Sequence, residues 1–324
     1  MTILVTGAAG FIGSHLCHYL LDRGDEVVGI DDLNDYYDPR LKEARLERLR
    51  RRNGFSFLKG DIADAKALPE AVSGRRIDKV AHLAAQAGVR YSLENPRAYV
   101  RSNLDGHLEI LELCRHLGSV EHLVYASSSS VYGGNEKVPF SETDPVDHPV
   151  SLYAATKKAD ELMSHAYAHL YGIPQTGLRF FTVYGPWGRP DMAYWLFTEA
   201  MLAGRPIRVF NNGDMWRDFT YINDIVWGTA AALDNPPAGS SGAPHRVYNI
   251  GHNEPENLDS FITILEEVLG VRAVRQYEPM QPGDVKQTYA DIDAIQKDLG
   301  FSPKVSLREG LTEFAQWYRG YFER

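Results

Sequence analysis

A tyrosine and a lysine four positions apart form the pattern in this sequence that most directly predicts chemistry. Tyr153 and Lys157 share one face if their segment is helical, because residues four apart are neighbours on a helix. A free tyrosine, with a pKa of about 10, is a poor base at pH 7, but a lysine cation one turn away favours the phenolate. Such a tyrosinate could remove a proton from a hydroxyl group as hydride leaves the same carbon. The same spacing also occurs by chance on surface helices.

Four consecutive serines precede this pair and follow an apolar run. Residues 127–130 are all serine, and residues 122–126 before them have the character of a strand. Ligands of parallel sheets bind at the carboxyl ends of the strands. The four hydroxyl groups are therefore either hydrogen-bond donors to a substrate or ordinary polar turn residues. Their position ahead of the tyrosine and lysine favours the first interpretation.

A third pattern, at the start of the chain, predicts a dinucleotide site. Gly7, Gly10 and Gly13 follow a β-branched run and open a helix-like segment. Glycines permit a tight turn there and let the backbone approach a pyrophosphate, which the free N–H groups of the helix N-terminus then bind. Asp31 ends the next apolar run, where a carboxylate accepts hydrogen bonds from an adenosine ribose. Because a carboxylate repels a 2′-phosphate, we expect NAD rather than NADP.

These residues need a scaffold, and the order of apolar and helical segments predicts one. Short apolar runs with the length of buried parallel strands alternate with helix-period segments. This alternation predicts an α/β fold, a Rossmann-like doubly wound parallel sheet covered on both faces. It weakens after about Val183, where turns rich in glycine and proline indicate a smaller C-terminal region. We expect strands at 3–6, 26–30, 55–58, 79–84, 122–126 and 175–181, and helices at 13–23, 41–52, 96–117 and 153–171.

Composition excludes several classes of protein. The 324 residues are 44% hydrophobic and 24% charged, which is typical of a globular chain and not of a disordered or fibrous one. A net charge of −9 removes the main driving force for non-specific binding to nucleic acid. We expect no membrane span and no signal peptide, and therefore a cytoplasmic protein. Basic residues between 40 and 52 are interpreted as a solvated helix face.

The cysteines and the paired histidines predict no metal or disulfide chemistry. Cys17 and Cys114 lie in apolar, helix-like stretches and are expected to be core thiols. His165 and His169 are four apart, a spacing that can suit a metal, but no third ligand is evident. We therefore expect no metal site.

Longer segments resemble a known family. The Gly-x-x-Gly and Tyr-x-x-x-Lys motifs resemble the extended short-chain dehydrogenases/reductases. The Gly-Val-Arg of residues 88–90 and the Gly-Arg-Pro-Asp-Met of residues 188–192 resemble the bacterial UDP-glucuronate 4-epimerases within that superfamily. The resemblance covers essentially the whole chain. Its segments are residues 5–13, 30–37, 82–90, 153–157, 180–192 and 217–221.

The resemblance implies a reaction, a cofactor and an organisation. The reaction is the reversible 4-epimerisation of UDP-glucuronate to UDP-galacturonate through a 4-keto intermediate, without decarboxylation. NAD would stay tightly bound and be regenerated in each cycle, and the protein would be a homodimer. The NAD-binding domain would comprise residues 1–182 and about 219–252. The nucleotide-sugar domain would comprise residues 183–218 and about 253–324.

The resemblance also implies roles for individual residues. Tyr153 is the expected base, Lys157 its helper and Ser128 the catalytic serine. The segment Gln281-Pro-Gly-Asp284 is expected near the diphosphate, although many sugar epimerases carry arginine in place of Gln281. The cofactor positions implied are Gly7, Gly10, Phe11, Ile12, Gly13, Asp31, Asn34, Asp61, Ile62, Leu83, Ala84, Ala85, Asn103, Tyr153 and Lys157. The substrate positions implied are Arg90, Ser128, Ser129, Ser130, Thr182, Arg189, Arg208, Phe210, Arg217, Gln281 and Asp284.

The serines also distinguish among related reactions. A 4-keto uronate carries its carboxylate β to the ketone and loses carbon dioxide readily, so an epimerase must hold that carboxylate out of alignment. Ser129, Ser130 and Thr182 are small neutral donors suited to this task. The family's dehydratases place Asp-Glu at positions 129 and 130, and its decarboxylases place Glu at 130. Ser130 argues against both.

Two other functions stay open at this point. A 4-epimerase of neutral UDP-sugars would share the same fold and the same catalytic residues. A non-catalytic protein that only binds NAD is a remote alternative, because atypical members of that kind usually lose the tyrosine or the lysine, and Tyr153 and Lys157 are both present here.

Overall fold

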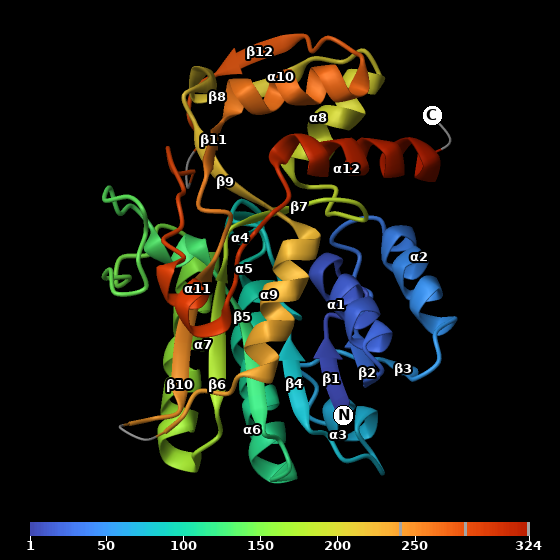
Figure 1. The fold of residues 1–324 in the computed structure, drawn as a ribbon, viewed down its shortest axis with the longest axis vertical. Helices are drawn as coiled ribbons and strands as arrows, with labels where there is room; N and C mark the ends of the chain where they lie inside the picture. The colour runs from blue at the N-terminus through green and yellow to red at the C-terminus, as the bar shows by residue number, and fades with distance from the viewer. Residues whose placement is uncertain (240–241, 282–283, 323–324) are drawn as a thin grey trace.

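The buried apolar runs form a seven-stranded sheet (Figure 1). The computed structural model describes residues 1–239, 242–281 and 284–322. The strand order is β10-β6-β5-β4-β1-β2-β3, and all pairs are parallel. The predicted α/β doubly wound architecture is therefore confirmed. The strands are β1 Thr2–Thr6, β2 Glu26–Asp31, β3 Phe55–Lys59, β4 Lys79–His82, β5 His122–Ser128, β6 Gln175–Phe180 and β10 His245–Ile250.

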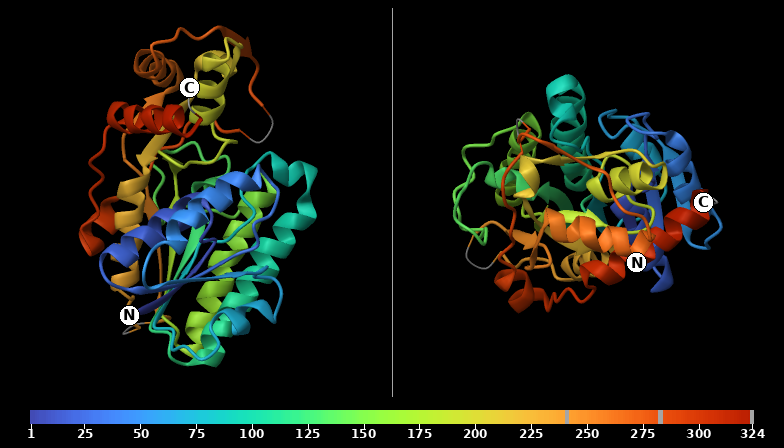
Figure 2. Two further views of the ribbon diagram at one scale, coloured as in Figure 1. Left: turned by 90° about the vertical axis from the view of Figure 1, so that its right-hand side faces the viewer. Right: turned by 90° about the horizontal axis from the view of Figure 1, so that it is seen from above.

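Helices cover both faces because successive side chains of a strand point to opposite sides of the sheet. Ile3 and Val5 of β1 pack in one core with Cys17, whereas Leu4 between them packs in a second core with Cys114. Burial of each such aliphatic side chain stabilises the fold by about 1.5–3 kcal/mol. Figure 2 shows the two layers on opposite faces. One layer holds α1 (Phe11–Asp22), α2 (Pro39–Arg50) and α9 (Ile222–Asp234), and the other holds α3 (Ala67–Ala71), α6 (Gly106–Leu117) and α7 (Leu152–Tyr171).

The helix expected over residues 96–117 is divided in the structure. Helix α5 (Pro96–Tyr99) leads into a π-helical turn, η1 (Val100–Asp105), and α6 follows directly. Short π-helical turns often mark functional sites. Here the turn carries Asn103, whose amide donates to Gln86 O at 3.1 Å and to Thr156 Oγ1 at 2.9 Å.

The interpretation of the basic stretch as a solvated face is wrong for part of α2. Lys42 and Arg45 are both buried, while Arg50 and Arg51 are exposed. Arg45 lies four residues from Leu41 and from Leu49, so it occupies the apolar face of its helix. Lys42 and Arg45 instead find polar partners inside the protein.

The chain after β6 forms most of a smaller region above the carboxyl ends of the large sheet (Figure 1). We propose the domain division expected from the sequence, because residues 1–182 and 219–252 contain every strand of the large sheet. Among the described helices, none combines the length and apolar character of a membrane span. The elements of this region are β7 Thr182–Tyr184, β8 Ile207–Phe210, β9 Trp216–Tyr221, β11 Pro255–Asn257, β12 Arg275–Glu278, α8 Ala193–Leu202, α10 Leu258–Leu269 and α12 Leu307–Phe322, while α11 Asp293–Leu299 packs near β10.

Candidate active site

A cavity of about 440 Å³ lies at the carboxyl ends of the large sheet. Its walls come from the turn after β1, the ends of β2, β4 and β5, the first turns of α7, and the segment of residues 182–192. In doubly wound sheets this edge is where ligands bind. The fold therefore brings the three sequence patterns together at one place.

The glycine turn leaves bare backbone at one end of the cavity. Gly7 has a φ of +69°, and a Cβ atom there would lie 2.8 Å from Ala84 N. A Cβ on Gly13 would lie 2.1 Å from Gly7 O, so neither position admits another residue without movement. Helix α1 begins at Phe11 with Gly10 as its N-cap, and no side chain caps its first N–H groups. These residues fit the pyrophosphate of a dinucleotide.

Asp31 and Asn34 are held in fixed orientations beside this turn. The Asp31 carboxylate accepts hydrogen bonds from Ala9 N at 3.0 Å and from Leu33 N at 2.9 Å. Burial raises the pKa of Asp31, while these N–H groups and the Lys42 cation oppose that shift. Lys42 Nζ donates to Asn34 O and Oδ1, both at 2.8 Å. A carboxylate so placed is suited to accept hydrogen bonds from a ribose.

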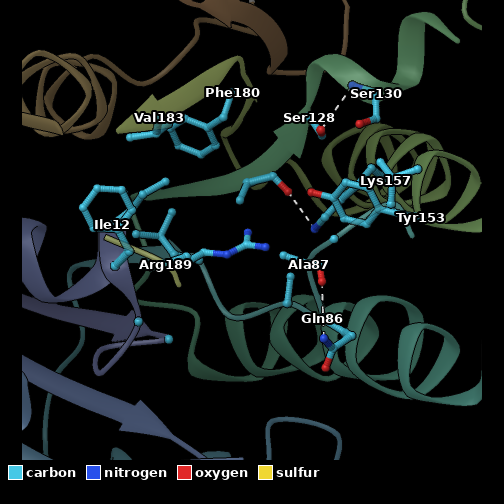
Figure 3. Close-up of a pocket in the computed structure, with 18 of the residues that line it drawn as sticks. Ile12, Gln86, Ala87, Ser128, Ser130, Tyr153, Lys157, Phe180, Val183 and Arg189 are labelled. Carbon is cyan, nitrogen blue, oxygen red and sulfur yellow. Dashed lines mark hydrogen bonds between the residues drawn. The ribbon is translucent and has the colours of Figure 1, made fainter. Parts of the chain in front are cut away.

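The tyrosine, the lysine and the serines meet in the middle of the cavity. Ser151 caps α7 by accepting a hydrogen bond from Ala154 N at 3.1 Å, which sets Tyr153 in the first turn of the helix. Lys157, one turn later, donates from Nζ to Ala126 O at 2.9 Å. Ser128 ends β5 and lines the same cavity. Figure 3 shows Tyr153, Lys157 and Ser128 around the space that Arg189 also faces.

Arg189 lies in the loop between β7 and α8 and points into the cavity (Figure 3). Its Nε donates to Asp191 Oδ1 at 3.0 Å and its Nη2 to Asp191 Oδ2 at 2.5 Å. Tyr36 Oη also donates to Asp191 Oδ2, at 3.1 Å. Burial alone would lower the pKa of Arg189, but Asp191 outweighs it and raises that pKa. The pair therefore stays ionised, and the Arg189 side chain is only 24% exposed.

Arg217 lines the far end of the cavity, and two more arginines lie near it, outside the wall. Arg217 and Asp284 line the wall, and burial lowers the pKa of Arg217 against the opposing charge of Asp284. Arg90 Nη2 donates to Asp284 Oδ2 at 2.8 Å. The Cζ atoms of Arg90 and Arg208 lie 4.8 and 4.9 Å from the ring centroid of Phe210. Arg208 also pairs with Glu278, with Nη2 and Oε2 2.6 Å apart. Three guanidinium groups with two paired carboxylates leave an excess of positive charge that is suited to a diphosphate.

Most residues predicted from the sequence line the cavity. Arg90, Arg208, Phe210 and Gln281 lie outside its wall, and Pro282 and Gly283 of the predicted segment lie outside the described residues. Asn103 also lies outside: it is buried against Gln86 and Thr156 and so shapes the wall from behind. The predicted residues in the wall are Gly7, Gly10, Phe11, Ile12, Gly13, Asp31, Asn34, Asp61, Ile62, Leu83, Ala84, Ala85, Ser128, Ser129, Ser130, Tyr153, Lys157, Thr182, Arg189, Arg217 and Asp284.

Sequence reasoning missed several other lining residues. Tyr36 and Tyr37 follow the strand that ends at Asp31, and that position was a usable signal because loops at this edge face the ligand. Gln86 and Ala87 line the cavity after β4 in the same way. Lys42 carried no such signal, because a basic residue within a basic helix is usually solvated.

Comparison with known proteins agrees with this geometry. The model of the NAD dependent epimerase/dehydratase family matches residues 3–251. The chain belongs to that family. It is 51% identical to UDP-glucuronate 4-epimerase 3 of Arabidopsis thaliana, over 99% of this chain and 77% of that protein.

Solved structures of members of the family superpose closely on this one. UDP-glucuronic acid 4-epimerase from Bacillus cereus, in complex with UDP-glucuronic acid and NAD, matches with a TM-score of 0.90 and 38% identity, over 99% of this chain and all (100%) of that chain. UDP-glucose 4-epimerase from Thermotoga maritima, with UDP-glucose, matches with a TM-score of 0.89 and 32% identity, over 99% and 100%. The resemblance inferred from the motifs is therefore confirmed.

Proposed function

We propose that this protein catalyses the reversible, NAD-dependent 4-epimerisation of UDP-glucuronate to UDP-galacturonate through a 4-keto intermediate, without decarboxylation. The observation that carries the proposal is that Ser129, Ser130 and Thr182 line the same cavity as Tyr153 and Lys157. A proton-transfer pair thus lies beside small neutral donors suited to a carboxylate. Similarity to UDP-glucuronate 4-epimerases over nearly the whole chain supports the same substrate.

The proposed chemistry divides among three side chains of α7 and β5. NAD, when bound, supplies a hydride acceptor that returns the hydride before the cycle ends. Tyr153 removes the proton of the 4-hydroxyl group as the carbon is oxidised and returns it at the end. The charge of Lys157, one helical turn from Tyr153, favours the phenolate. Ser128 donates a hydrogen bond to the hydroxyl oxygen and then to the ketone oxygen. The 4-keto sugar must rotate before reduction on its other face.

Retention of the carboxylate needs a second set of contacts. We propose that the hydroxyl groups of Ser129, Ser130 and Thr182 hold it where the bond to carbon dioxide cannot align with the ketone. Arg189 is ion-paired with Asp191, so its charge is largely balanced within the cavity wall. The neutral hydroxyl groups therefore hold the carboxylate without adding a full charge beside the reacting carbon.

The test is proton NMR of the purified protein with UDP-glucuronate and no added cofactor. UDP-galacturonate without carbon dioxide release supports the epimerase with its own bound NAD. A UDP-pentose product means that Ser129, Ser130 and Thr182 do not protect the carboxylate and that the protein is a decarboxylase. If nothing changes even with added NAD, and UDP-galactose is converted instead, the proposed carboxylate recognition is withdrawn.

Replacement of Tyr153 by Phe tests the assignment of the base. The variant keeps the ring but loses the proton-accepting oxygen, so we expect turnover to fall by about 100-fold or more while NAD stays bound. Tyr167→Phe is the matched control, because Tyr167 lies on the same helix and donates to Glu112 Oε1 at 2.5 Å, away from the cavity. If the Tyr153→Phe variant turns over at the wild-type rate, Tyr153 is not the base and the proposed mechanism is wrong.

We also propose a homodimer formed through the outer face of α6 and α7. Leu108, Leu162 and Leu170 on these helices are exposed, with 59% of Leu162 and 66% of Leu170 accessible. Exposed apolar side chains on adjacent helices are typical of an interface. A cytoplasmic location is likewise our proposal, consistent with two buried cysteines that form no disulfide.

A further inference from the structure

Arg45 connects three segments that are far apart in the sequence. Arg45 is fully buried in α2. The oxygens that accept the hydrogen bonds described below are uncharged: backbone carbonyls and one tyrosine hydroxyl. Nη1 reaches Ala9 O in the glycine turn at 3.2 Å and Tyr37 Oη at 2.7 Å. Nε and Nη2 reach Trp187 O at 2.9 and 2.6 Å, and Nη2 also reaches Gly188 O at 2.7 Å.

The loop that Arg45 holds has an unusual backbone and carries a cavity residue. Trp187 has a φ of +59°, a left-handed conformation that costs a non-glycine residue free energy unless its surroundings impose it. A Cβ on Gly188 would lie 2.0 Å from Tyr194 Oη, so this part of the loop is also packed tightly. Arg189 comes next and points into the cavity, where Asp191 pairs with it.

We infer that Arg45 is a positioning residue: it ties the loop of residues 185–191 to the cofactor-binding turn and so fixes Arg189 where it faces the same space as Tyr153 and Lys157. Only a planar fork with several N–H groups spans these acceptors, since lysine offers a single nitrogen. Lysine or glutamine at this position would release the loop. The expected loss of kcat/KM for UDP-glucuronate rests on the proposed function, but the expected release of the loop does not.

The first test measures the loop directly by hydrogen exchange and mass spectrometry on the full-length protein. In Arg45→Gln we expect amide exchange in residues 186–192 to rise by about tenfold or more, while β1 keeps its protection. Arg48→Gln is the matched control: Arg48 lies on the same helix with its Cζ 4.7 Å from the Trp187 ring, and its loss leaves the Arg45 contacts in place. Unchanged loop exchange in Arg45→Gln overturns the inference.

The second test is a double-mutant cycle with Arg189→Gln, read as kcat/KM for UDP-glucuronate. Arg45→Gln alone should lower kcat/KM by about 10- to 100-fold, because small misplacements at a site are costly. In the Arg189→Gln background it should lower kcat/KM by less than about threefold, since the two residues then act as one unit. Effects that simply multiply mean that Arg45 acts independently of Arg189, and they overturn the inference.

Two further steps separate failure of the inference about Arg45 from failure to fold and from failure of the proposed function. If Arg45→Gln does not fold, Arg45→Lys replaces it in both tests, because it keeps the buried charge and loses only the fork. If the wild-type protein does not convert UDP-glucuronate, the proposed function fails, and hydrogen exchange alone judges the role of Arg45.

Discussion

Asp160 lies one turn beyond Lys157 on α7 and shares its burial. Lys157 Nζ donates to Asp160 Oδ2 at 3.1 Å, and the two side chains are only 3% and 1% exposed. Burial raises the pKa of Asp160 to about 6, against the opposing charge of Lys157. A carboxyl group whose pKa is raised by folding binds its proton more tightly in the folded state. Its contribution to stability therefore declines as pH rises from about 4 to 6.

Asp160→Asn isolates this contribution. Relative to that variant, the wild-type protein should gain about 1 kcal/mol of unfolding free energy when pH is lowered from 7 to 5. Denaturant unfolding of both proteins at the two pH values measures the difference. Asp105→Asn, at an exposed position on η1, serves as the control. The difference in unfolding free energy between the wild type and this variant should not change between the two pH values. A wild-type advantage that does not vary with pH would contradict the prediction.

Residues were predictable where local geometry dictates their use. The pairing of Tyr153 with Lys157 follows from helix periodicity, and the run of four serines from its place at a strand end. The choice of Ser128 among those serines came from the family resemblance. Arg45 was not predictable, because three of its five hydrogen bonds go to backbone carbonyls in a loop that the chain reaches only after several more elements. Asn103 is buried and bonds to Gln86 and Thr156, and its expected contact with the cofactor stays a prediction. A short motif indicates which segment of the chain lies near the site. The packing around that segment decides which of its side chains face the cavity.

At the scale of elements, a buried ion pair fixes the helix of the base to β6, and a hydrogen bond from Ser127 to the same carboxylate adds the strand of the serines. Arg179 on β6 donates from Nε and Nη2 to the Glu161 carboxylate on α7 at 2.8 and 2.9 Å. Ser127 Oγ on β5 donates to the same carboxylate at 2.7 Å. Burial alone would raise the pKa of Glu161, but Arg179 outweighs it and lowers that pKa. Three elements are thereby held in one register beneath the cavity.

Glu161→Gln should be strongly destabilising. It leaves the Arg179 charge buried without its partner, which costs about 3–5 kcal/mol. Glu267→Gln is the control, since its pair with Arg308 is about half exposed on both sides and should contribute no more than about 1 kcal/mol. Thermal unfolding of both variants measures the contrast. Equal losses in the two variants would mean that the buried network does not hold these elements together.

Element boundaries were predictable where a cap or a strand end marks them. Pro96 begins α5 as expected, with Asn95 accepting from Ala98 N as its cap. The π-helical turn η1 was not predictable, because it differs from an α-helix by one step in the hydrogen-bond pattern and barely disturbs the apolar period. The bonds of Asn103 to Gln86 and Thr156, which accompany the turn, join residues distant in the sequence.

At the scale of the whole molecule, six of the seven strands of the large sheet could be predicted, but β10 and the pairing of strands in the smaller region could not. Alternating strands and helices leave few parallel arrangements, because crossovers are right-handed and connections are short. In the smaller region, β9 pairs with β7 and β11, and β8 pairs with β12, which joins residues 207–210 to 275–278. Such pairings depend on contacts across the fold, and the short strands carry little period of their own.

The proposed homodimer makes a prediction about the molecule as a whole. Leu162→Glu and Leu170→Glu each place a carboxylate on the outer face of α7, where a partner would bury it without a counter-charge. A penalty of about 4 kcal/mol would weaken association by roughly a thousandfold, so both variants should sediment as monomers where the wild type sediments as a dimer. Stability of the separated chain should change by less than about 0.5 kcal/mol, because both leucines are exposed within it. Leu196→Glu, on the exposed side of α8, is the matched control and should remain dimeric. A wild-type protein that sediments as a monomer, or α7 variants that stay dimeric, would exclude this face as the interface.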